Sequence, residues 1–219
     1  MIQFENVTAT YADDVGIFDL SFHIEKGEMV FLMGPTGAGK STVLKTIYKD
    51  ILLKDGSLYI NGQDITYMRT RKIPYYRRKI GMIFQDFQLI GDRSVFENVA
   101  LPLHILGFSS KEIKSKVNGI LEKVGLETVK KMFPSQLSGG EQQRVSIARA
   151  LVKNPVVILA DEPTGNLDPN VSDEILDLLE LATSNGTSVL MSTHNFPLIH
   201  PRHKRFIEMS EGRQVINDI

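Results

Sequence analysis

The sequence of 219 residues contains no cysteine, has almost no net charge and shows no long hydrophobic run. Without cysteine, the chain can form neither a disulfide nor a thiolate metal site. A formal net charge of −1 gives no electrostatic reason to expect a nucleic acid as a partner. No apolar run reaches the length of a membrane span, and the first residues indicate a strand, not a signal peptide. These absences predict a cytosolic protein that associates with a membrane only through a partner.

The clearest local pattern is a glycine-rich loop between a short apolar run and a helix. Residues 34–41 (GPTGAGKS) match the phosphate-binding loop G-x-x-x-x-G-K-[ST], in the strand–loop–helix context that this motif requires. The glycines let the backbone N–H groups approach an anion closely, and the helix N-terminus adds partial positive charge. Lys40 would reach the β- and γ-phosphates, and the Ser41 hydroxyl would ligate Mg²⁺. The loop predicts a nucleoside triphosphate site formed by Gly34, Pro35, Thr36, Gly37, Ala38, Gly39, Lys40, Ser41 and Thr42.

The remaining apolar patterns predict an α/β fold. Alternation of apolar and polar residues between positions 2 and 24 indicates antiparallel strands, with Tyr11 in the turn between them. Short unbroken apolar runs are typical of buried parallel strands, and they occur at 29–33, 80–84, 156–160 and 188–193.

A helical region interrupts this pattern of strands. Between residues 86 and 151 helical spacing dominates, and Ser94 and Ser109 each begin a capping box. Ahead of it, a basic run from Arg69 to Lys79 is typical of a solvated surface. With no repeat and no long linker, we expect one domain over residues 1–219. Its core comprises 1–86 and 152–219, and its helical subdomain covers about 87–151.

Polar side chains follow successive strands of the predicted parallel sheet. Gln85, the pair Asp161-Glu162, and His194 each come directly after an apolar run. Ligands of open α/β sheets bind beyond the carboxyl ends of the strands, so these side chains should meet at the phosphate loop. Phosphoryl transfer needs charge neutralisation and an aligned water. Asp161 is suited to orient Mg²⁺ through water and Glu162 to act as general base. His194 is suited to bond the γ-phosphate, and Gln85 to sense both Mg²⁺ and the water.

A second candidate anion site lies at Leu137-Ser138-Gly139-Gly140-Glu141-Gln142-Gln143, where a serine and two glycines precede a helix. Because a helical insertion separates it from the phosphate loop, one chain cannot easily close both elements on one nucleotide. Two copies arranged head to tail could, each covering the other's loop.

The string LSGGEQQ at 137–143 resembles the signature motif of ATP-binding cassette (ABC) ATPases, and the other motifs of that family follow in order along the whole chain. This resemblance implies a RecA-like core, an antiparallel β subdomain, a helical subdomain, and an ATP-dependent dimer that encloses two ATP molecules. It also implies that Tyr11 stacks on adenine and that a membrane subunit docks near Phe87–Leu103, where Phe87, Leu89 and Phe96 are expected to be exposed. Residues acting in trans would be Ser138, Gly139, Gly140, Gln142 and Asp168.

Within the family, residues 77–89 and 92–100 are similar to the bacterial cell-division ATPases, which regulate peptidoglycan remodelling through a polytopic membrane subunit. The segment 163–168 is shared with lipoprotein-releasing and macrolide-exporter ATPases, so an exporter permease remains an alternative partner. A soluble ATP switch is a further alternative, although the helical region is too short for the coiled coil of the DNA-repair relatives. A small-molecule kinase would leave the signature string and His194 unexplained.

Overall fold

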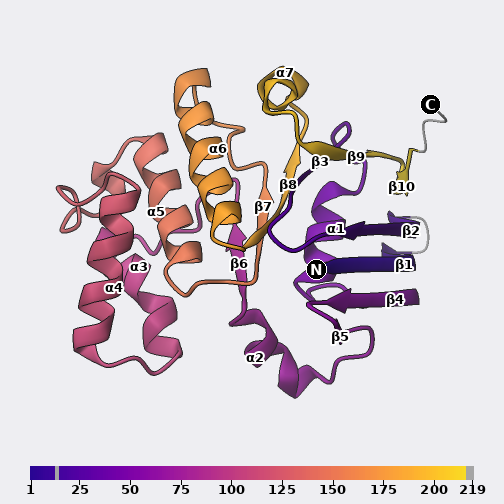
Figure 1. Cartoon of the computed structure of the whole chain (residues 1–219), viewed down its shortest axis with the longest axis horizontal. Helices are drawn as coiled ribbons and strands as arrows, with labels where there is room; N and C mark the ends of the chain where they lie inside the picture. Colours follow the sequence, from indigo (N-terminus) through magenta and orange to yellow (C-terminus); the bar gives the residue numbers. More distant parts are fainter. Residues whose placement is uncertain (13–14, 216–219) are drawn as a thin grey trace.

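The computed structural model describes residues 1–12 and 15–215 and contains two β-sheets (Figure 1). The smaller sheet is antiparallel, with the order β2-β1-β4-β5, and comprises β1 (Ile2–Ala12), β2 (Val15–Ile24), β4 (Asp55–Ile60) and β5 (Gln63–Asp64). The buried side chains of β2 alternate with more exposed ones, as the sequence pattern predicts. Tyr11 belongs to the end of β1 and not to a turn, which corrects the expectation from sequence.

The larger sheet has the order β10-β9-β3-β8-β7-β6 and is parallel except at β10. Its strands are β3 (Met29–Met33), β6 (Ile80–Ile83), β7 (Val157–Asp161), β8 (Ser188–Thr193), β9 (Arg205–Ser210) and β10 (Arg213–Gln214). Every residue of β8 is buried, as expected of a central strand that is covered on both faces. The predicted α/β class is therefore confirmed.

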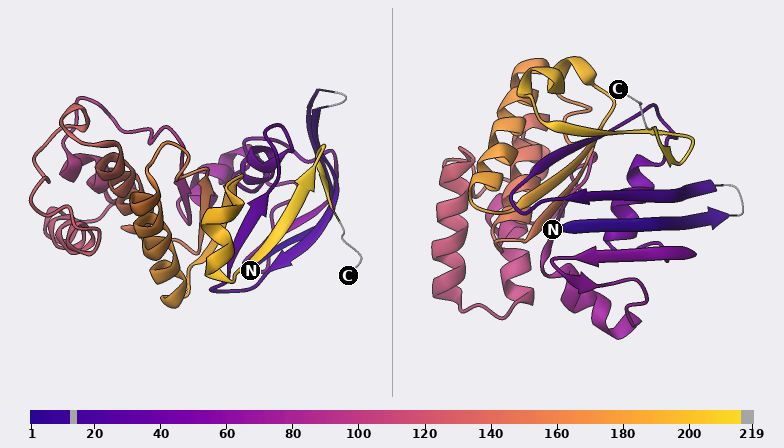
Figure 2. Two further views of the ribbon diagram at one scale, coloured as in Figure 1. Left: turned by 90° about the horizontal axis from the view of Figure 1, so that it is seen from above. Right: turned by 45° about the vertical axis from the view of Figure 1, so that its right-hand side comes forward.

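Helices cover the parallel sheet and form a separate layer at one end of the molecule (Figures 1 and 2). In chain order they are α1 (Lys40–Ile47), α2 (Ile73–Arg77), α3 (Val95–Ile105), α4 (Ser110–Lys123), α5 (Gly139–Leu151), α6 (Pro169–Ser184) and α7 (Phe196–Ile199). Short 3-10 turns occur at η1 (Thr70–Lys72), η2 (Pro134–Gln136) and η3 (His200–Arg202). Both predicted capping boxes form, with Ser94 and Ser109 accepting from the amides of Glu97 and Glu112.

Three hydrophobic clusters hold these layers together. The first joins the antiparallel sheet to α1 and one face of the parallel sheet, through residues such as Leu44 and Leu58. The second lies on the opposite face of the parallel sheet beneath α6, and includes Phe31 and Leu176. The third, centred on residues such as Val99, joins α3, α4 and α5. No helix within the described ranges 1–12 and 15–215 is long and apolar enough to cross a membrane.

Candidate functional site

The glycine-rich loop connects β3 to α1 and depends on backbone conformations that glycine alone adopts readily. Gly34 has φ +146°, and a Cβ there would lie 2.2 Å from the carbonyl oxygen of Met209. Gly39, at φ +97°, precedes the first residue of α1 without a side-chain cap. The amides at the start of α1 are thus left for a ligand, which is the arrangement that binds phosphate.

The Lys40 side chain is buried at the base of this loop. Its ammonium donates hydrogen bonds to the carbonyl oxygens of Gly34 (2.8 Å) and Pro35 (3.0 Å). The same Nζ lies 3.6 Å from Oε1 of Glu162, at the end of β7. A buried cation is thus held in place by backbone oxygens with a carboxylate beside it, where a phosphate would find a fixed positive charge.

The Glu162 carboxylate lies between Lys40 of the phosphate loop and His194, which follows β8. Its other carboxylate oxygen, Oε2, lies 3.0 Å from Nδ1 of His194. The Glu162 amide donates to both the hydroxyl (3.0 Å) and the carbonyl (3.2 Å) of Ser192. Its backbone has φ +44°, an uncommon conformation for a residue with a Cβ. Such strain is concentrated at functional sites, and here the bonds to Ser192 maintain it.

Asp161 lies between two hydroxyl groups. The Ser41 hydroxyl donates to Oδ1 at 3.0 Å, and the Ser192 hydroxyl donates to the same atom at 2.6 Å. Sequence reasoning identified Ser41 and Asp161 but missed Ser192, which the parallel register places opposite Asp161. The pairing of the two apolar runs would have shown that the side chain two residues before His194 faces the same edge.

These groups line a cavity of about 540 Å³, within the size range of small-molecule sites. Its lining is Val15, Gly16, Thr36, Gly37, Gly39, Lys40, Ser41, Thr42, Gln85, Asp161, Glu162 and His194. Gly34 and Pro35 instead line an adjacent hollow of about 380 Å³ that also reaches His194, and Ala38 is buried. Tyr11 is not among the described residues that line this cavity: its ring is half-exposed, with Nζ of Lys45 5.8 Å from its centroid, and the preceding Thr10 pairs with the lining residue Gly16. Sequence reasoning did not identify Val15 and Gly16.

The signature segment forms the N-terminus of α5, with Ser138 as its cap. The Ser138 hydroxyl accepts from the Glu141 amide (3.3 Å) and donates to the Glu141 carboxylate (2.7 Å). This bond from the hydroxyl and a second from the Ser138 amide lower the pKa of Glu141. A Cβ on Gly140 would lie 2.8 Å from Cγ1 of Val171, so α5 can approach α6 closely here only with glycine.

Within one chain the signature segment does not reach the phosphate-loop cavity. Among the described residues that line the cavity, none belongs to the group expected to act in trans: Ser138, Gly139, Gly140, Gln142 and Asp168. Asp168 instead caps α6, where its carboxylate accepts from the Val171 amide at 3.1 Å. The two predicted anion-binding elements therefore do not share a cavity within the part of one chain that the structure describes.

Comparison with known proteins identifies the family. The family model described as "ABC transporter" matches residues 17–165. The cell division ATP-binding protein FtsE of Escherichia coli K12 is 49% identical over 97% of this chain and 96% of its own length. FtsE of Bacillus subtilis is 45% identical over 97% of this chain and 93% of its own length. The chain belongs to the FtsE family of ABC ATPases.

Solved structures support the same assignment. The ATP-binding cassette MJ0796, in a dimeric post-hydrolysis state bound to ADP and Pi, superposes with a TM-score of 0.88 and 36% identity, covering 99% of this chain and 97% of that one. CbiO1 of Clostridium perfringens, part of the ABC transporter complex cbiONQ, superposes with a TM-score of 0.91 and 29% sequence identity, covering 98% of this chain and 86% of that one. The ABC nucleotide-binding fold and the ATPase class predicted from the motifs are confirmed.

The segment that follows Gln85 in this FtsE-family chain has an irregular backbone, and a side chain of α5 holds it in place. Phe87 and Gln88 both have positive φ, +60° and +48°. The Arg149 guanidinium, reaching up from α5, donates to the carbonyl oxygens of Phe87 (2.7 Å) and Gln88 (2.6 Å). Consecutive left-handed residues are strained, so this arginine holds in place a turn that the local sequence does not favour.

The expected exposure of this segment is wrong in detail. Phe87, Leu89 and Phe96 are half-buried, and Leu89 and Phe96 pack against the helical core. Leu101 is an exposed apolar side chain (38%) that lines a hollow of about 250 Å³, together with Tyr48, Phe84 and other residues. This hollow lies between the parallel sheet and the helical layer.

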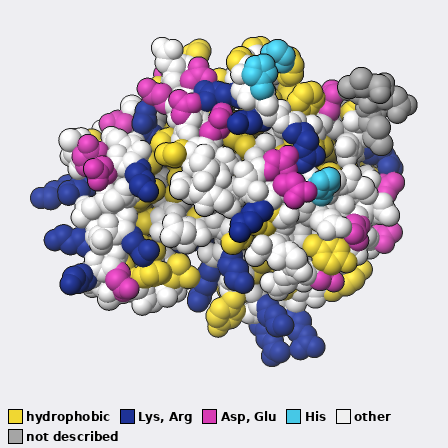
Figure 3. Space-filling model, in the orientation of Figure 1, with side chains coloured by type: hydrophobic (Ala, Val, Ile, Leu, Met, Phe, Trp, Pro, Cys, Tyr) yellow, Lys and Arg dark blue, Asp and Glu magenta, His cyan; other side chains and the backbone are white. Residues whose placement is uncertain are grey.

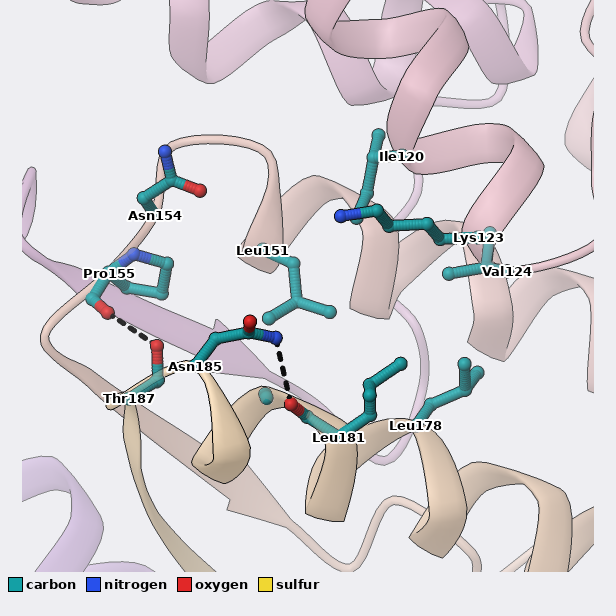
Figure 4. Close-up of a pocket in the computed structure, with 11 residues that line it drawn as sticks. Ile120, Lys123, Val124, Leu151, Asn154, Pro155, Leu178, Leu181, Asn185 and Thr187 are labelled. Carbon is teal, nitrogen blue, oxygen red and sulfur yellow. Dashed lines mark hydrogen bonds between the residues drawn. The ribbon is translucent and has the colours of Figure 1, made fainter. Parts of the chain in front are cut away.

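A further hollow of about 440 Å³ lies away from the phosphate loop, between α4, the end of α5 and the end of α6 (Figure 4). Apolar side chains such as Ile120, Leu151 and Leu178 form much of its wall. In Figure 4, Lys123 extends across one side and Asn185 bonds to the carbonyl of Leu181 at 2.9 Å. None of the predicted site residues is among the described residues that line it.

Gln143 in α5 is fully buried, and neither its amide nitrogen nor its amide oxygen has a hydrogen-bond partner among the described residues. Burying an unsatisfied amide costs about 1–3 kcal/mol, so Gln143→Met, of similar volume, is expected to raise the free energy of unfolding by about that amount. Urea titration measures the change, and the exposed position Gln63→Met is the control, expected within about 0.5 kcal/mol of wild type. Destabilisation of Gln143→Met beyond that margin would contradict an unpaired amide.

Proposed function

We propose that this chain is the ATP-hydrolysing subunit of a cell-division ABC complex that regulates peptidoglycan remodelling at the septum. The observation that carries the catalytic part is the Glu162 carboxylate, fixed between Lys40 Nζ (3.6 Å) and His194 Nδ1 (3.0 Å) at the rim of the cavity. The observation that carries the cell-division part is the identity to FtsE proteins along nearly the whole chain.

The proposed catalytic residues divide the work according to their chemistry. Lys40 holds the β- and γ-phosphates as a fixed positive charge, and the backbone N–H groups that follow Pro35 in the loop and are not paired within it bond the phosphate oxygens. Glu162 accepts the proton of the attacking water as general base. His194 orients Glu162 and bonds the γ-phosphate, and Gln85, which lines the same cavity, helps to place the water. Tyr11, at the edge of the site, stacks on adenine.

The donor set at this site fits Mg²⁺, which prefers oxygen ligands and retains several waters. The Ser41 hydroxyl and an Asp161 carboxylate oxygen lie 3.0 Å apart, and the Gln85 side chain lines the same cavity. When bound, Mg²⁺ neutralises charge on the phosphates. Ser41 and Gln85 would hold it directly and Asp161 through water, and the Ser192 hydroxyl would fix the Asp161 carboxylate.

A second copy of the chain would complete the site in a head-to-tail, ATP-dependent homodimer. The signature helix cannot serve its own cavity, as its residues are absent from the described lining. Ser138, Gly139, Gly140 and Gln142 of one copy would cover the γ-phosphate of the other, with Asp168 beside them. The helical subdomain at about 87–151 would then move against the core of 1–86 and 152–219. No role is proposed for nucleic acid.

The membrane partner we propose is a polytopic, FtsX-like subunit that docks near Phe87–Leu103 and holds the chain at the cytoplasmic face of the membrane. The hollow beside Leu101 supports this assignment, because Phe84, directly before Gln85, and Gln88, three residues after it, both line the hollow. Force at that hollow would be transmitted to Gln85 over a few residues. An exporter permease is the alternative partner, because one motif is shared with exporter ATPases.

Leu101→Asp is expected to reduce recovery of the membrane partner at least about tenfold, because a charge is placed in an apolar contact. The measurement is capture from detergent-solubilised membranes with MgATP, and the control Ile105→Asp, on an exposed residue of α3 outside the hollow, is expected to behave as wild type. Capture of a subunit with few spans and a large extracytoplasmic domain supports the division role. Capture of an export subunit favours the alternative, and capture of no membrane protein favours a soluble switch.

A further inference from the structure

The basic run from Arg69 to Lys79 is not used by the nucleotide site. It spans η1 and α2 and contains no acidic residue among its cations, which are Arg69, Arg71, Lys72, Arg77, Arg78 and Lys79. Arg77 is paired with Asp50. Within residues 1–12 and 15–215, the other cations of this run form no ion pair. The cations of this run that form no ion pair therefore make a local basic surface on a chain whose overall charge is near zero.

Two exposed tyrosines accompany these cations, Tyr67 just before the run and Tyr75 within it. The Tyr67 side chain is 79% exposed and the Tyr75 side chain 64%. The Arg78 guanidinium lies 4.8 Å from the centroid of the Tyr75 ring. In Figure 3, Lys and Arg side chains project from the lower edge of the molecule, where Figure 1 places α2. We call this surface the basic ledge and define it as Tyr67, Arg69, Arg71, Lys72, Tyr75, Arg78 and Lys79.

The basic ledge is continuous with the hollow proposed for the membrane partner. Arg77 is not part of the ledge but directly precedes its residues Arg78 and Lys79, and its guanidinium lies 4.5 Å from the ring centroid of Tyr48, which lines that hollow. Lys153, also in its wall, donates to the carbonyl oxygen of Arg77 at 3.2 Å. Ile80, directly after the ledge, lines the hollow as well. A partner embedded in a bilayer and seated in this hollow would bring the ledge towards the headgroups around it.

We propose that the basic ledge binds the anionic headgroups of the phospholipid surface beside the membrane partner. The position of the ledge relative to the bilayer rests on the proposed function, while the chemistry rests on the ledge itself. Anionic leaflets attract juxtamembrane Lys and Arg, and tyrosine favours the interface between headgroups and water. One acidic residue, Asp64, lines a hollow together with Tyr67, Arg69 and Lys72 of the ledge. Its carboxylate accepts a hydrogen bond from the Thr66 amide at 2.8 Å.

The test is flotation of the full chain, without partner or nucleotide, on vesicles of phosphatidylcholine alone and of phosphatidylcholine mixed with phosphatidylglycerol. Binding is expected only to the mixed vesicles and is expected to weaken as salt is raised. Each cation near the surface increases the partitioning of the chain onto anionic vesicles about fivefold. Replacing Arg69, Arg71 and Lys72 together by glutamine is therefore expected to lower this partitioning about 100-fold. Replacing the two arginines by lysine is expected to leave it nearly unchanged, because the attraction depends on charge.

A matched control removes the same charge elsewhere. Neutralising the exposed lysines Lys111, Lys114 and Lys123 of α4 is expected to change partitioning less than about twofold, because they lie outside the ledge. Equal losses in both triple variants, or equal binding to both kinds of vesicle, would overturn the proposal. The proposal would also be overturned if the ledge bound a single-stranded oligonucleotide more tightly than it binds the mixed vesicles. The flotation assay contains no membrane protein and no ATP. A negative result there refutes lipid binding by the ledge, whereas a negative result in the capture experiment refutes the proposed membrane partner.

Discussion

Replacing Glu162 by glutamine is expected to lower ATP turnover by about 10²–10⁴-fold while ATP binding persists. The amide keeps the shape of the side chain, and therefore its fit between Lys40 and His194, but it cannot accept a proton from water. With the phosphates still bound by the loop and Lys40, the substrate is held and does not react. The measurement is phosphate release by the Glu162→Gln chain beside equilibrium binding of a fluorescent ATP analogue with Mg²⁺.

A second readout of the same variant is the oligomeric state. If two copies close on ATP and hydrolysis reopens them, then Glu162→Gln with MgATP is expected to accumulate as a dimer in size-exclusion chromatography, and the wild type is not. Glu127→Gln, at an exposed position after α4, is the control and is expected to match wild type in both readouts. Turnover of Glu162→Gln at the wild-type rate would rule out Glu162 as the base.

The parts of the site that sequence predicts best are those determined by local chemistry. The phosphate loop needs glycine at fixed spacing, and strand ends carry Gln85, Asp161, Glu162 and His194, so a linear pattern contains most of the information. Ser192 was missed because its role arises only from the register of β7 against β8. The alternation of a single strand does not say which residue of its neighbour lies opposite.

Sequence failed where tertiary packing decides a side chain's environment. In the irregular segment after Gln85 no periodicity indicates which face is buried, and Leu89 packs onto the helical core there, as does Phe96 in the first turn of α3. The left-handed pair Phe87 and Gln88 depends on Arg149, far away in sequence. Neither feature follows from propensity, since each depends on how the helical layer sits against the sheet.

Lys40→Ala is expected to weaken ATP binding about 100-fold or more and to abolish turnover. The ammonium is the positive side chain at the base of the loop, and its removal also leaves the Glu162 carboxylate without the cation that lies 3.6 Å from it. The affinity falls because the bound phosphates lose the ammonium that would contact them, and losing one partner of such a buried charge pair costs about 2–5 kcal/mol. Isothermal titration with MgATP measures the loss, and Lys54→Ala, at an exposed position before β4, is expected to bind as wild type. Unchanged affinity in Lys40→Ala would refute this role.

The same variant tests whether the site is shared between two copies. Ser138→Arg places a bulky cation at the cap of α5, and alone it is expected to be inactive because each composite site contains a damaged signature. In a head-to-tail dimer that pairs a Lys40→Ala chain with a Ser138→Arg chain, one site combines both defects and the other combines two intact elements. Mixing the two inactive chains is therefore expected to restore turnover.

Mixing Lys40→Ala with Glu162→Gln is the control for that experiment. Both changes lie on the core half of the site, beside the same phosphate loop, with Lys40 Nζ and Glu162 Oε1 3.6 Å apart in one chain. A mixed dimer then has a damaged core half at each site and no intact pair, so no turnover is expected to return. Recovery in both mixtures, or in neither, would contradict a site built from the loop of one copy and the signature helix of the other. Recovery in the first mixture alone follows only if Ser138 acts across the dimer, because within its own chain it does not line the cavity.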